Sequence, residues 1–239
     1  MLVQMPLKMG LRDEATFKSY VAEDESVAYA LFSLQTNIKQ PKGNAFYLYG
    51  ARHVGKTHLL QAACRHATEL GLSSVYLPMA DLSLPLIPDV LTGLEHTHVV
   101  CLDDIGQVVG QPAWEQALNN LIIRGSTQGN TLIIAGDLPM EQWALVEKEL
   151  TKALMTIVPV PLLPLTQKEE LISALQRHSQ CLGFELPENV GDYLIKHHAQ
   201  TLPELMQILR LLEEATLVQK RKLTLQFVRS ILQVKEKLK

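Results

Sequence analysis

The chain has 239 residues, of which 47% are hydrophobic and 20% are charged, with 22 Lys and Arg against 25 Asp and Glu for a formal net charge of −3. This composition is typical of a soluble globular protein, and it excludes a disordered chain, a collagen and a coiled coil. A slightly acidic chain also lacks the excess of Lys and Arg that charge-driven binding to nucleic acid requires, so we expect no direct DNA binding.

Signals for export and for membrane insertion are missing from the sequence. Its longest apolar stretch, residues 153–165, contains three prolines and is shorter than the roughly 20 residues that span a bilayer. The first residues lack the basic segment and long apolar run of a secretory signal. Cys64, Cys101 and Cys181 are widely separated, which favours buried thiols over a disulfide framework or a metal site. We therefore expect a cytoplasmic protein.

Short apolar runs alternate with amphipathic segments over the first two thirds of the chain. This alternation predicts an α/β fold in which helices cover both faces of a parallel sheet. The expected strands are residues 45–49, 74–78, 98–102, 131–136 and 156–162, and the expected helices are residues 25–39, 56–70, 89–94, 114–123 and 140–152.

The last expected strand carries Pro159 and Pro161, two residues apart. Alternate residues of a strand direct their N–H groups to the same side, so both missing donors lie along one side of this strand. A strand in the middle of a sheet needs donors on both sides. We therefore expect this strand at an edge of the sheet.

From Thr166 onward the pattern changes to helices alone. The spacing of Thr166 and Glu169 is that of a capping box, Pro187 begins a second helix, and Thr201 and Thr224 open a third and a fourth. Three parts are therefore expected: a tail at residues 1–12, an α/β domain at residues 13–163, and a small helical domain at residues 164–239.

The strongest motif follows the first expected strand, where residues 50–57 read Gly-Ala-Arg-His-Val-Gly-Lys-Thr. This is the complete GxxxxGKT pattern of a phosphate-binding loop, and its place between a strand and a helix disfavours a chance match. Lys56 is expected to contact the β- and γ-phosphates of ADP or ATP, and Thr57 to ligate Mg²⁺. The other expected nucleotide contacts are Gly50, Val54, Gly55 and His58.

Acidic residues end the next strands at the same edge of the sheet. Asp103 and Asp104 end the third strand, where Asp103 can hold Mg²⁺ through water and Asp104 can orient or deprotonate an attacking water. Asp137 ends the fourth strand and is expected near the γ-phosphate. The alternative for each acid is a helix cap or a turn at a strand end.

The sequence resembles the DnaA/Hda family of AAA+ P-loop NTPases. The resemblance is carried by residues 16–21, 46–50, 55–60 and 102–105, and by residues 183–191 and 219–224, which are similar to the lid of the Hda members. It implies a five-stranded parallel sheet of order 5-1-4-3-2 with a C-terminal four-helix lid. The DnaA members continue into a helix-turn-helix DNA-binding domain, which this sequence does not include.

The resemblance also implies a function and partners. Hda-type proteins act with the sliding clamp of DNA polymerase III, loaded on DNA, to promote hydrolysis of the ATP bound to DnaA, and so restrain replication initiation. DnaA and the clamp are therefore the expected partners, and a homodimer is left open. The family's clamp-binding peptide corresponds here to Leu2, Met5, Pro6 and Leu7, although Leu2 stands where the family has glutamine. The alternative is an unstructured tail.

Two departures from the family pattern bear on hydrolysis. The family has an arginine finger after the fourth strand, but this sequence has no arginine between Arg124 and Arg177. Lys152 is the nearest basic residue to that position; it keeps the charge without the planar fork of arginine. Pro203 stands where a lid arginine is expected. We therefore expect this chain to bind nucleotide but to hydrolyse it slowly or not at all. We also expect it to stimulate DnaA to hydrolyse the ATP bound to DnaA.

Two other classes of protein share the phosphate-binding loop. A self-sufficient ATPase that remodels or loads a partner, as helicase loaders do, would normally carry an arginine finger and a recruitment domain. A P-loop kinase of a small metabolite would need an acceptor pocket in place of the helical lid. Neither set of features is evident in the sequence, so the regulatory interpretation is favoured.

Overall fold

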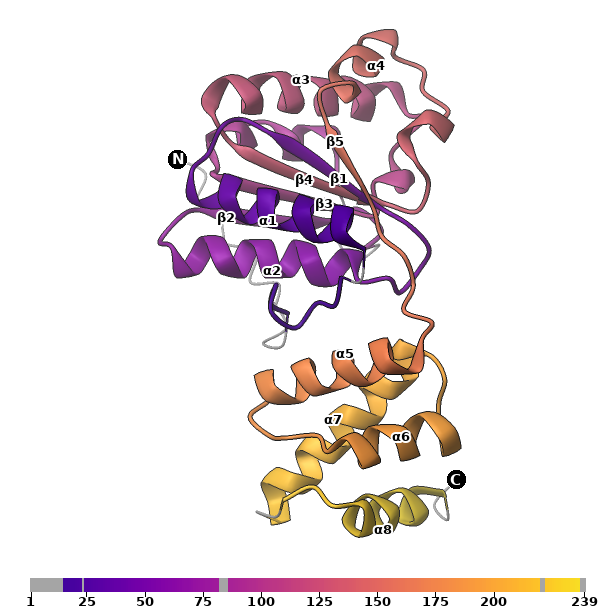
Figure 1. The fold of residues 1–239 in the computed structure, drawn as a ribbon. Helices are drawn as coiled ribbons and strands as arrows, with labels where there is room; N and C mark the ends of the chain where they lie inside the picture. Colours follow the sequence, from indigo (N-terminus) through magenta and orange to yellow (C-terminus); the bar gives the residue numbers. More distant parts are fainter. Residues whose placement is uncertain (1–14, 23, 82–85, 220–221, 237–239) are drawn as a thin grey trace. The chain divides into compact units, whose positions relative to one another are not determined.

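The computed structural model describes residues 15–22, 24–81, 86–219 and 222–236. They divide into two compact units (Figure 1): the first holds residues 24–162 with Ala15 and Thr16, and the second holds residues 17–22 and those from Leu163 onward. Within the described ranges, no helix combines the length and the apolar character needed to cross a membrane.

The first unit is built on a parallel sheet of five strands. They are β1 (Ala45–Tyr49), β2 (Ser74–Pro78), β3 (Val99–Asp103), β4 (Thr131–Gly136) and β5 (Val158–Pro161), and all of the pairings are parallel. Their order across the sheet is β2-β3-β4-β1-β5. This confirms the expected order 5-1-4-3-2, and it places β1, which leads into the phosphate-binding loop, between β4 and β5.

Helices cover both faces of this sheet, which confirms the α/β fold class (Figure 1). α1 (Glu25–Lys39) and α2 (Lys56–Glu69) lie on one face, and α3 (Pro112–Gln128) and α4 (Lys148–Leu154) lie on the other. Successive residues of a strand face opposite sides of the sheet. Tyr47 of β1 therefore packs in the same apolar cluster as residues of α3 and α4.

The edge position of β5 agrees with the argument from its prolines. The N–H of Leu162 donates to the carbonyl oxygen of Tyr49 at 2.7 Å, so residues of this parity direct their donors toward β1. Pro159 and Pro161 have the opposite parity, and their missing donors fall on the open side of the strand. The prediction of an edge strand is confirmed.

The expected helix over residues 140–152 is wrong. A 3₁₀ turn at Met140–Gln142 and the short helix α4 replace it, with an extended stretch between them. The backbone N–H groups of Val146 and Glu147 donate to the buried carboxylate of Glu115 instead of joining a helix. The helix expected over residues 89–94 is likewise two 3₁₀ turns, Pro88–Leu91 and Leu94–His96.

The second unit contains four helices around one apolar core. They are α5 (Lys168–Cys181), α6 (Glu188–His197), α7 (Leu202–Gln219) and α8 (Leu225–Glu236). Thr224 caps α8 as expected, because its hydroxyl accepts the N–H of Phe227 at 3.3 Å. The capping box of α5 is one residue later than expected and joins Gln167 to Glu170.

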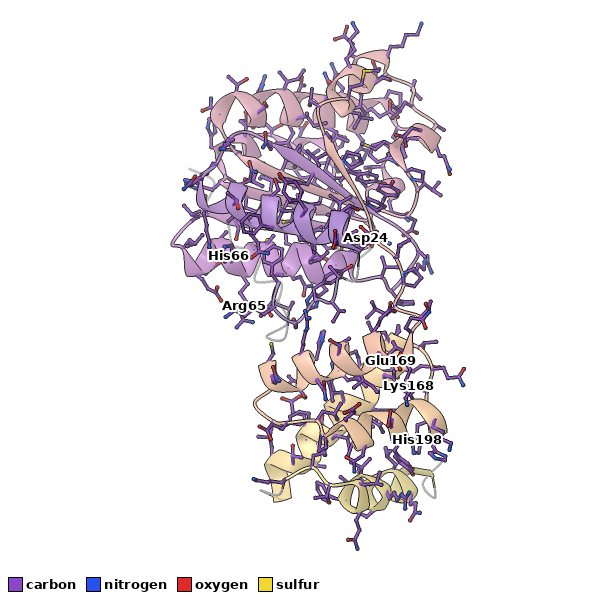
Figure 2. The ribbon with its side chains drawn as sticks, viewed as in Figure 1. Asp24, Arg65, His66, Lys168, Glu169 and His198 are labelled. Carbon is purple, nitrogen blue, oxygen red and sulfur yellow. The ribbon has the colours of Figure 1, made fainter. Side chains whose placement is uncertain are left out.

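Polar contacts made by residues of α5 tie the second unit together. Lys168 (Figure 2) places its Nζ 2.6 Å from Asp192 Oδ1 of α6. Arg177 Nη1 donates to the carbonyl oxygen of Tyr20 at 2.9 Å, which attaches the segment before α1 to this unit.

Cys181 at the end of α5 is exposed, so the prediction of three buried thiols is wrong for this residue and correct for the other two cysteines.

Candidate functional site

Glycine shapes the loop between β1 and α2. Gly50 has φ +150°, and a Cβ added to it would lie 2.2 Å from the carbonyl oxygen of Leu162, so no other residue fits. Gly55 is in the left-handed conformation, with φ +98°, immediately before α2. No side chain caps α2, and its first turn contains no acidic residue. Its first N–H groups are thus directed at whatever occupies the loop, an arrangement suited to an anion.

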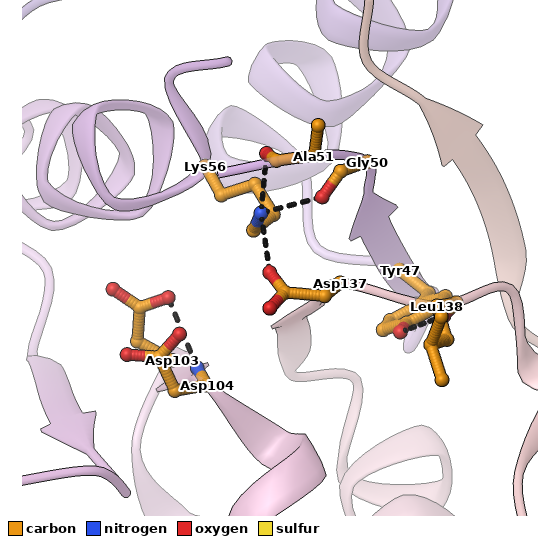
Figure 3. Close-up of polar contacts among 8 residues, drawn as sticks. All are labelled: Tyr47, Gly50, Ala51, Lys56, Asp103, Asp104, Asp137 and Leu138. Carbon is orange, nitrogen blue, oxygen red and sulfur yellow. Dashed lines mark hydrogen bonds and ion pairs between the residues drawn. The ribbon is translucent and has the colours of Figure 1, made fainter. Parts of the chain in front are cut away.

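Lys56 stands at the centre of the site (Figure 3). Its side chain is buried, and its Nζ donates to the carbonyl oxygens of Gly50 at 2.7 Å and Ala51 at 2.9 Å. The same ammonium group lies 2.9 Å from Asp137 Oδ1, at the end of β4. Three oxygens therefore hold the charge of Lys56 inside the loop, and a phosphate group that binds Lys56 must replace some of these contacts.

Asp103, at the end of β3, is held rigidly. Its carboxylate is buried and accepts the hydroxyl of Tyr76 at 2.8 Å and the N–H of Asp104 at 3.1 Å. Burial, together with the charge of Asp103, raises the pKa of Tyr76, so its hydroxyl stays protonated and remains a donor. A carboxylate with two of its acceptor positions used can still accept bonds from waters of a hydrated Mg²⁺.

Asp104 adds a second carboxyl group at the same edge. Burial raises its pKa, and the negative charges of Asp103 and Asp137 raise it further, whereas Lys56 and Arg52 act in the opposite direction. The three acids expected from the sequence are therefore close enough to interact electrostatically. A divalent cation placed among them would relieve this repulsion, so the residues present fit the expected Mg²⁺.

The remaining expected residues lie in different places. Thr57 is in the first turn of α2 and Val54 is buried in the loop. His58 uses its Nε2 atom in a 2.9 Å contact with the carbonyl oxygen of Thr16. Lys152 is exposed on α4. The four residues of the expected clamp peptide, Leu2, Met5, Pro6 and Leu7, lie outside the described residues.

Two residues that support the site were not expected from the sequence. Tyr76 anchors Asp103, and Glu115, which is 1% exposed, joins two loops next to the site. The sequence does contain a weak signal for each. Tyr76 is an aromatic residue with a polar hydroxyl in a partly buried strand, and Glu115 is an acid on the apolar face of α3 between Trp114 and Leu118.

Comparison with known proteins shows which folds and family models these features resemble. The chain is similar in structure to domain III of the replication initiator DnaA from Thermotoga maritima, with a TM-score of 0.70 and 19% identity over 93% of this chain and 97% of that one. Residues 168–232 match the family model described as "Hda, lid domain". The chain therefore has the fold of DnaA domain III, and its second unit is similar to the lid domain of Hda proteins.

Other matches agree with a DnaA/Hda-like fold. AMPPCP-bound DnaA from Aquifex aeolicus aligns with a TM-score of 0.67 and 19% identity, over 85% of this chain and 66% of that one. The Holliday junction branch migration motor RuvB from T. maritima aligns with a TM-score of 0.61 and 14% identity, over 93% and 73%. A model described as "RNA helicase" matches residues 46–134, the part that holds the phosphate-binding loop and Asp103. At these identities the structural likenesses show the fold alone.

Proposed function

We propose that this protein binds an adenine nucleotide with Mg²⁺ at the loop of residues 50–57 and regulates DnaA. In this role it restrains replication initiation by promoting hydrolysis of the ATP bound to DnaA, together with the DNA-loaded sliding clamp. The observation that carries the nucleotide site is the buried Lys56 ammonium, which lies inside a glycine-shaped loop opposite the carboxylate of Asp137.

Each site residue has a defined task in nucleotide binding. The N–H groups of the loop and of the first turn of α2 surround the phosphates, and Lys56 exchanges its present contacts for phosphate oxygens. Thr57 and Asp103 would hold Mg²⁺, the former directly and the latter through water. When bound, Mg²⁺ neutralises part of the phosphate charge. The DnaA of A. aeolicus was solved with AMPPCP, which supports an adenine nucleotide here.

Slow intrinsic hydrolysis is consistent with the same residues. We propose that Asp104 and Asp137 orient an attacking water and that Asp104 accepts its proton; the raised pKa of Asp104 supports the second role. The sequence offers no arginine in the family's finger position, and lysine stabilises the developing charge less specifically. We propose that nucleotide occupancy, more than turnover, is what this site provides.

Action on DnaA is supported by the second unit. The match of residues 168–232 to the Hda lid points to the regulator branch of the family. We propose that exposed Lys152 approaches the nucleotide of DnaA, and that Leu2, Met5, Pro6 and Leu7 contact the clamp.

The proposal is tested by adding the purified chain to ATP-loaded DnaA in the presence of clamp loaded on DNA. Hydrolysis of the DnaA-bound ATP is expected to accelerate only when the chain, the clamp and the DNA are all present. Replacing Met5, Pro6 and Leu7 by alanine should abolish this acceleration, because the chain then no longer contacts the clamp. If DnaA hydrolyses its ATP at the same rate with and without the chain, the regulatory proposal is wrong.

A stand-alone ATPase is the second candidate. It is favoured by the similarity to RuvB, whose structure is described as a motor, and by the match to the RNA helicase model. This candidate predicts multiple turnovers of ATP by the chain alone, at a rate that DnaA does not change. The same assay, run without DnaA, separates the two candidates.

A further inference from the structure

Glu115 is a buried carboxylate in the first turn of α3 that lies outside the recognised nucleotide motifs. It is 1% exposed and accepts three backbone N–H groups. Its Oε1 atom accepts from Gly110 at 2.8 Å, and its Oε2 atom accepts from Val146 at 2.9 Å and from Glu147 at 2.7 Å. A buried charge is stable only when it is paired or hydrogen-bonded in this way, and hydrogen bonds to an ionised acceptor are the strong ones.

These three donors belong to two different loops. Gly110 follows Asp103 and Asp104 in the connection from β3 to α3. Val146 and Glu147 end the connection from Asp137 to α4, which we call the 138–147 loop. One side chain therefore joins the loops at the carboxyl ends of β3 and β4, the two strands that carry the acids of the site.

The 138–147 loop is also held at its beginning, by Tyr47. The Tyr47 hydroxyl donates to the carbonyl oxygen of Leu138, directly after Asp137 (Figure 3). The ring of Tyr47 packs edge to face with Trp143 of the same loop, with ring centroids 5.2 Å apart. A Cβ at Gly136 would lie 2.5 Å from the Tyr47 hydroxyl, so glycine is required for this approach.

We propose that Glu115 is a positioning residue of the nucleotide site, which acts through the 138–147 loop to hold the Asp137 carboxylate against Lys56. The inference rests on the proposed nucleotide binding and adds to it a residue that contacts no nucleotide. A fixed Asp137 carboxylate competes with phosphate for the Lys56 ammonium. Loosening the far end of the loop therefore frees Lys56 and strengthens binding of a nucleoside triphosphate.

The test is a double-mutant cycle read by calorimetry with a non-hydrolysable ATP analogue and Mg²⁺. Glu115→Gln keeps the size of the side chain but replaces one acceptor oxygen with a donor, so one of the two anchors is lost. It is expected to strengthen binding by about threefold, in the same direction as Asp137→Asn. In the Asp137→Asn background the same change is expected to alter the affinity by less than about 1.5-fold, because the carboxylate that it positions is gone.

Glu95→Gln is the matched control. Glu95 is also a buried carboxylate of this unit; it accepts the N–H of Gly93 at 2.8 Å and lies 3.2 Å from Arg124 of α3. It precedes β3, at the opposite end of that strand from Asp103. Its replacement should lower stability and leave the affinity within about 1.5-fold of wild type.

An equal change of affinity in both backgrounds, or no change in either, would overturn the inference, because a purely structural loss does not depend on Asp137. If Glu115→Gln does not fold, Tyr47→Phe releases the loop at its other end and must show the same dependence on Asp137. A wild-type protein that binds no nucleotide would instead refute the proposed function, so the two failures are distinct.

Discussion

Lys56 Nζ lies 2.9 Å from Asp137 Oδ1, which pairs the lysine of the phosphate-binding loop with the acid that follows β4. The pairing follows from the sheet. Tyr49 of β1 and Gly136 of β4 are partners in register, so the residues after them, Gly50 and Asp137, leave the sheet side by side. The loop lysine then folds back over its own carbonyl oxygens and meets the carboxylate of the neighbouring strand.

Tyr76→Phe tests the anchoring of Asp103. The change removes the 2.8 Å hydrogen bond and leaves a buried carboxylate oxygen without its donor. We expect a loss of about 1–3 kcal/mol in the free energy of unfolding and weaker Mg²⁺-dependent nucleotide binding. Chemical denaturation and Mg²⁺ titration measure the two effects. Tyr29→Phe, at a side chain that is 74% exposed, is the control and should change neither.

Asp104→Asn tests the electrostatics of the acidic edge through pH. Burial, Asp103 and Asp137 raise the pKa of Asp104, so the folded protein binds this proton more tightly than the unfolded chain. The stabilising contribution of such a group is complete below its unfolded pKa and is lost as pH rises through its folded pKa. Asp104→Asn should therefore unfold at a higher temperature than wild type at about pH 7.5, and the difference should shrink as pH falls toward about 4. A difference that stays constant with pH would refute this explanation.

The cysteines should differ in reactivity. Cys64 and Cys101 are buried, and burial raises the pKa of the Cys101 thiol well above its ordinary value, whereas Cys181 is exposed. Because the thiolate is the reactive form, a thiol reagent should modify Cys181 alone in the native protein and all three cysteines after denaturation. Mass spectrometry of the modified peptides identifies the sites. Rapid native labelling of Cys101 would contradict the burial of β3.

Lys152→Ala tests the proposed contact with the nucleotide of DnaA. Lys152 is exposed on α4, so its loss should leave the folding and the nucleotide affinity of this protein unchanged. If the ammonium stabilises charge on the DnaA-bound ATP, the stimulated hydrolysis should fall by about tenfold or more. Lys148→Ala, at an exposed lysine of the same helix, is the matched control. An unaffected rate would show that Lys152 does not replace the arginine finger.

Local chemistry explains why much of the fold could be predicted from the sequence. The phosphate-binding loop is specified by consecutive residues between β1 and α2, and the edge strand by the spacing of Pro159 and Pro161. Both signals depend on near neighbours in the chain. Strand order beyond the edge came from the family resemblance, because apolar runs alone do not reveal which strands pair.

The features that could not be predicted depend on distant residues. The helix expected over residues 140–152 is interrupted because Glu115, about thirty positions earlier, takes the N–H groups of Val146 and Glu147. Tyr76 supports Asp103 only because β2 pairs with β3 in a register that brings their ends together. Such contacts leave no periodic signal in the sequence. The only indication of them is a polar side chain within an otherwise apolar helix face or strand.

The most direct measurement of the central claim is calorimetric titration of the protein with ADP and ATP in the presence of Mg²⁺, compared with Lys56→Ala. We predict binding of one adenine nucleotide per chain, weakened by about 10- to 100-fold when the Lys56 ammonium is removed, since a hydrogen bond to a charged group contributes about 1.5–3 kcal/mol. Binding that is absent in the wild-type protein, or that is equally strong in Lys56→Ala, would contradict the account.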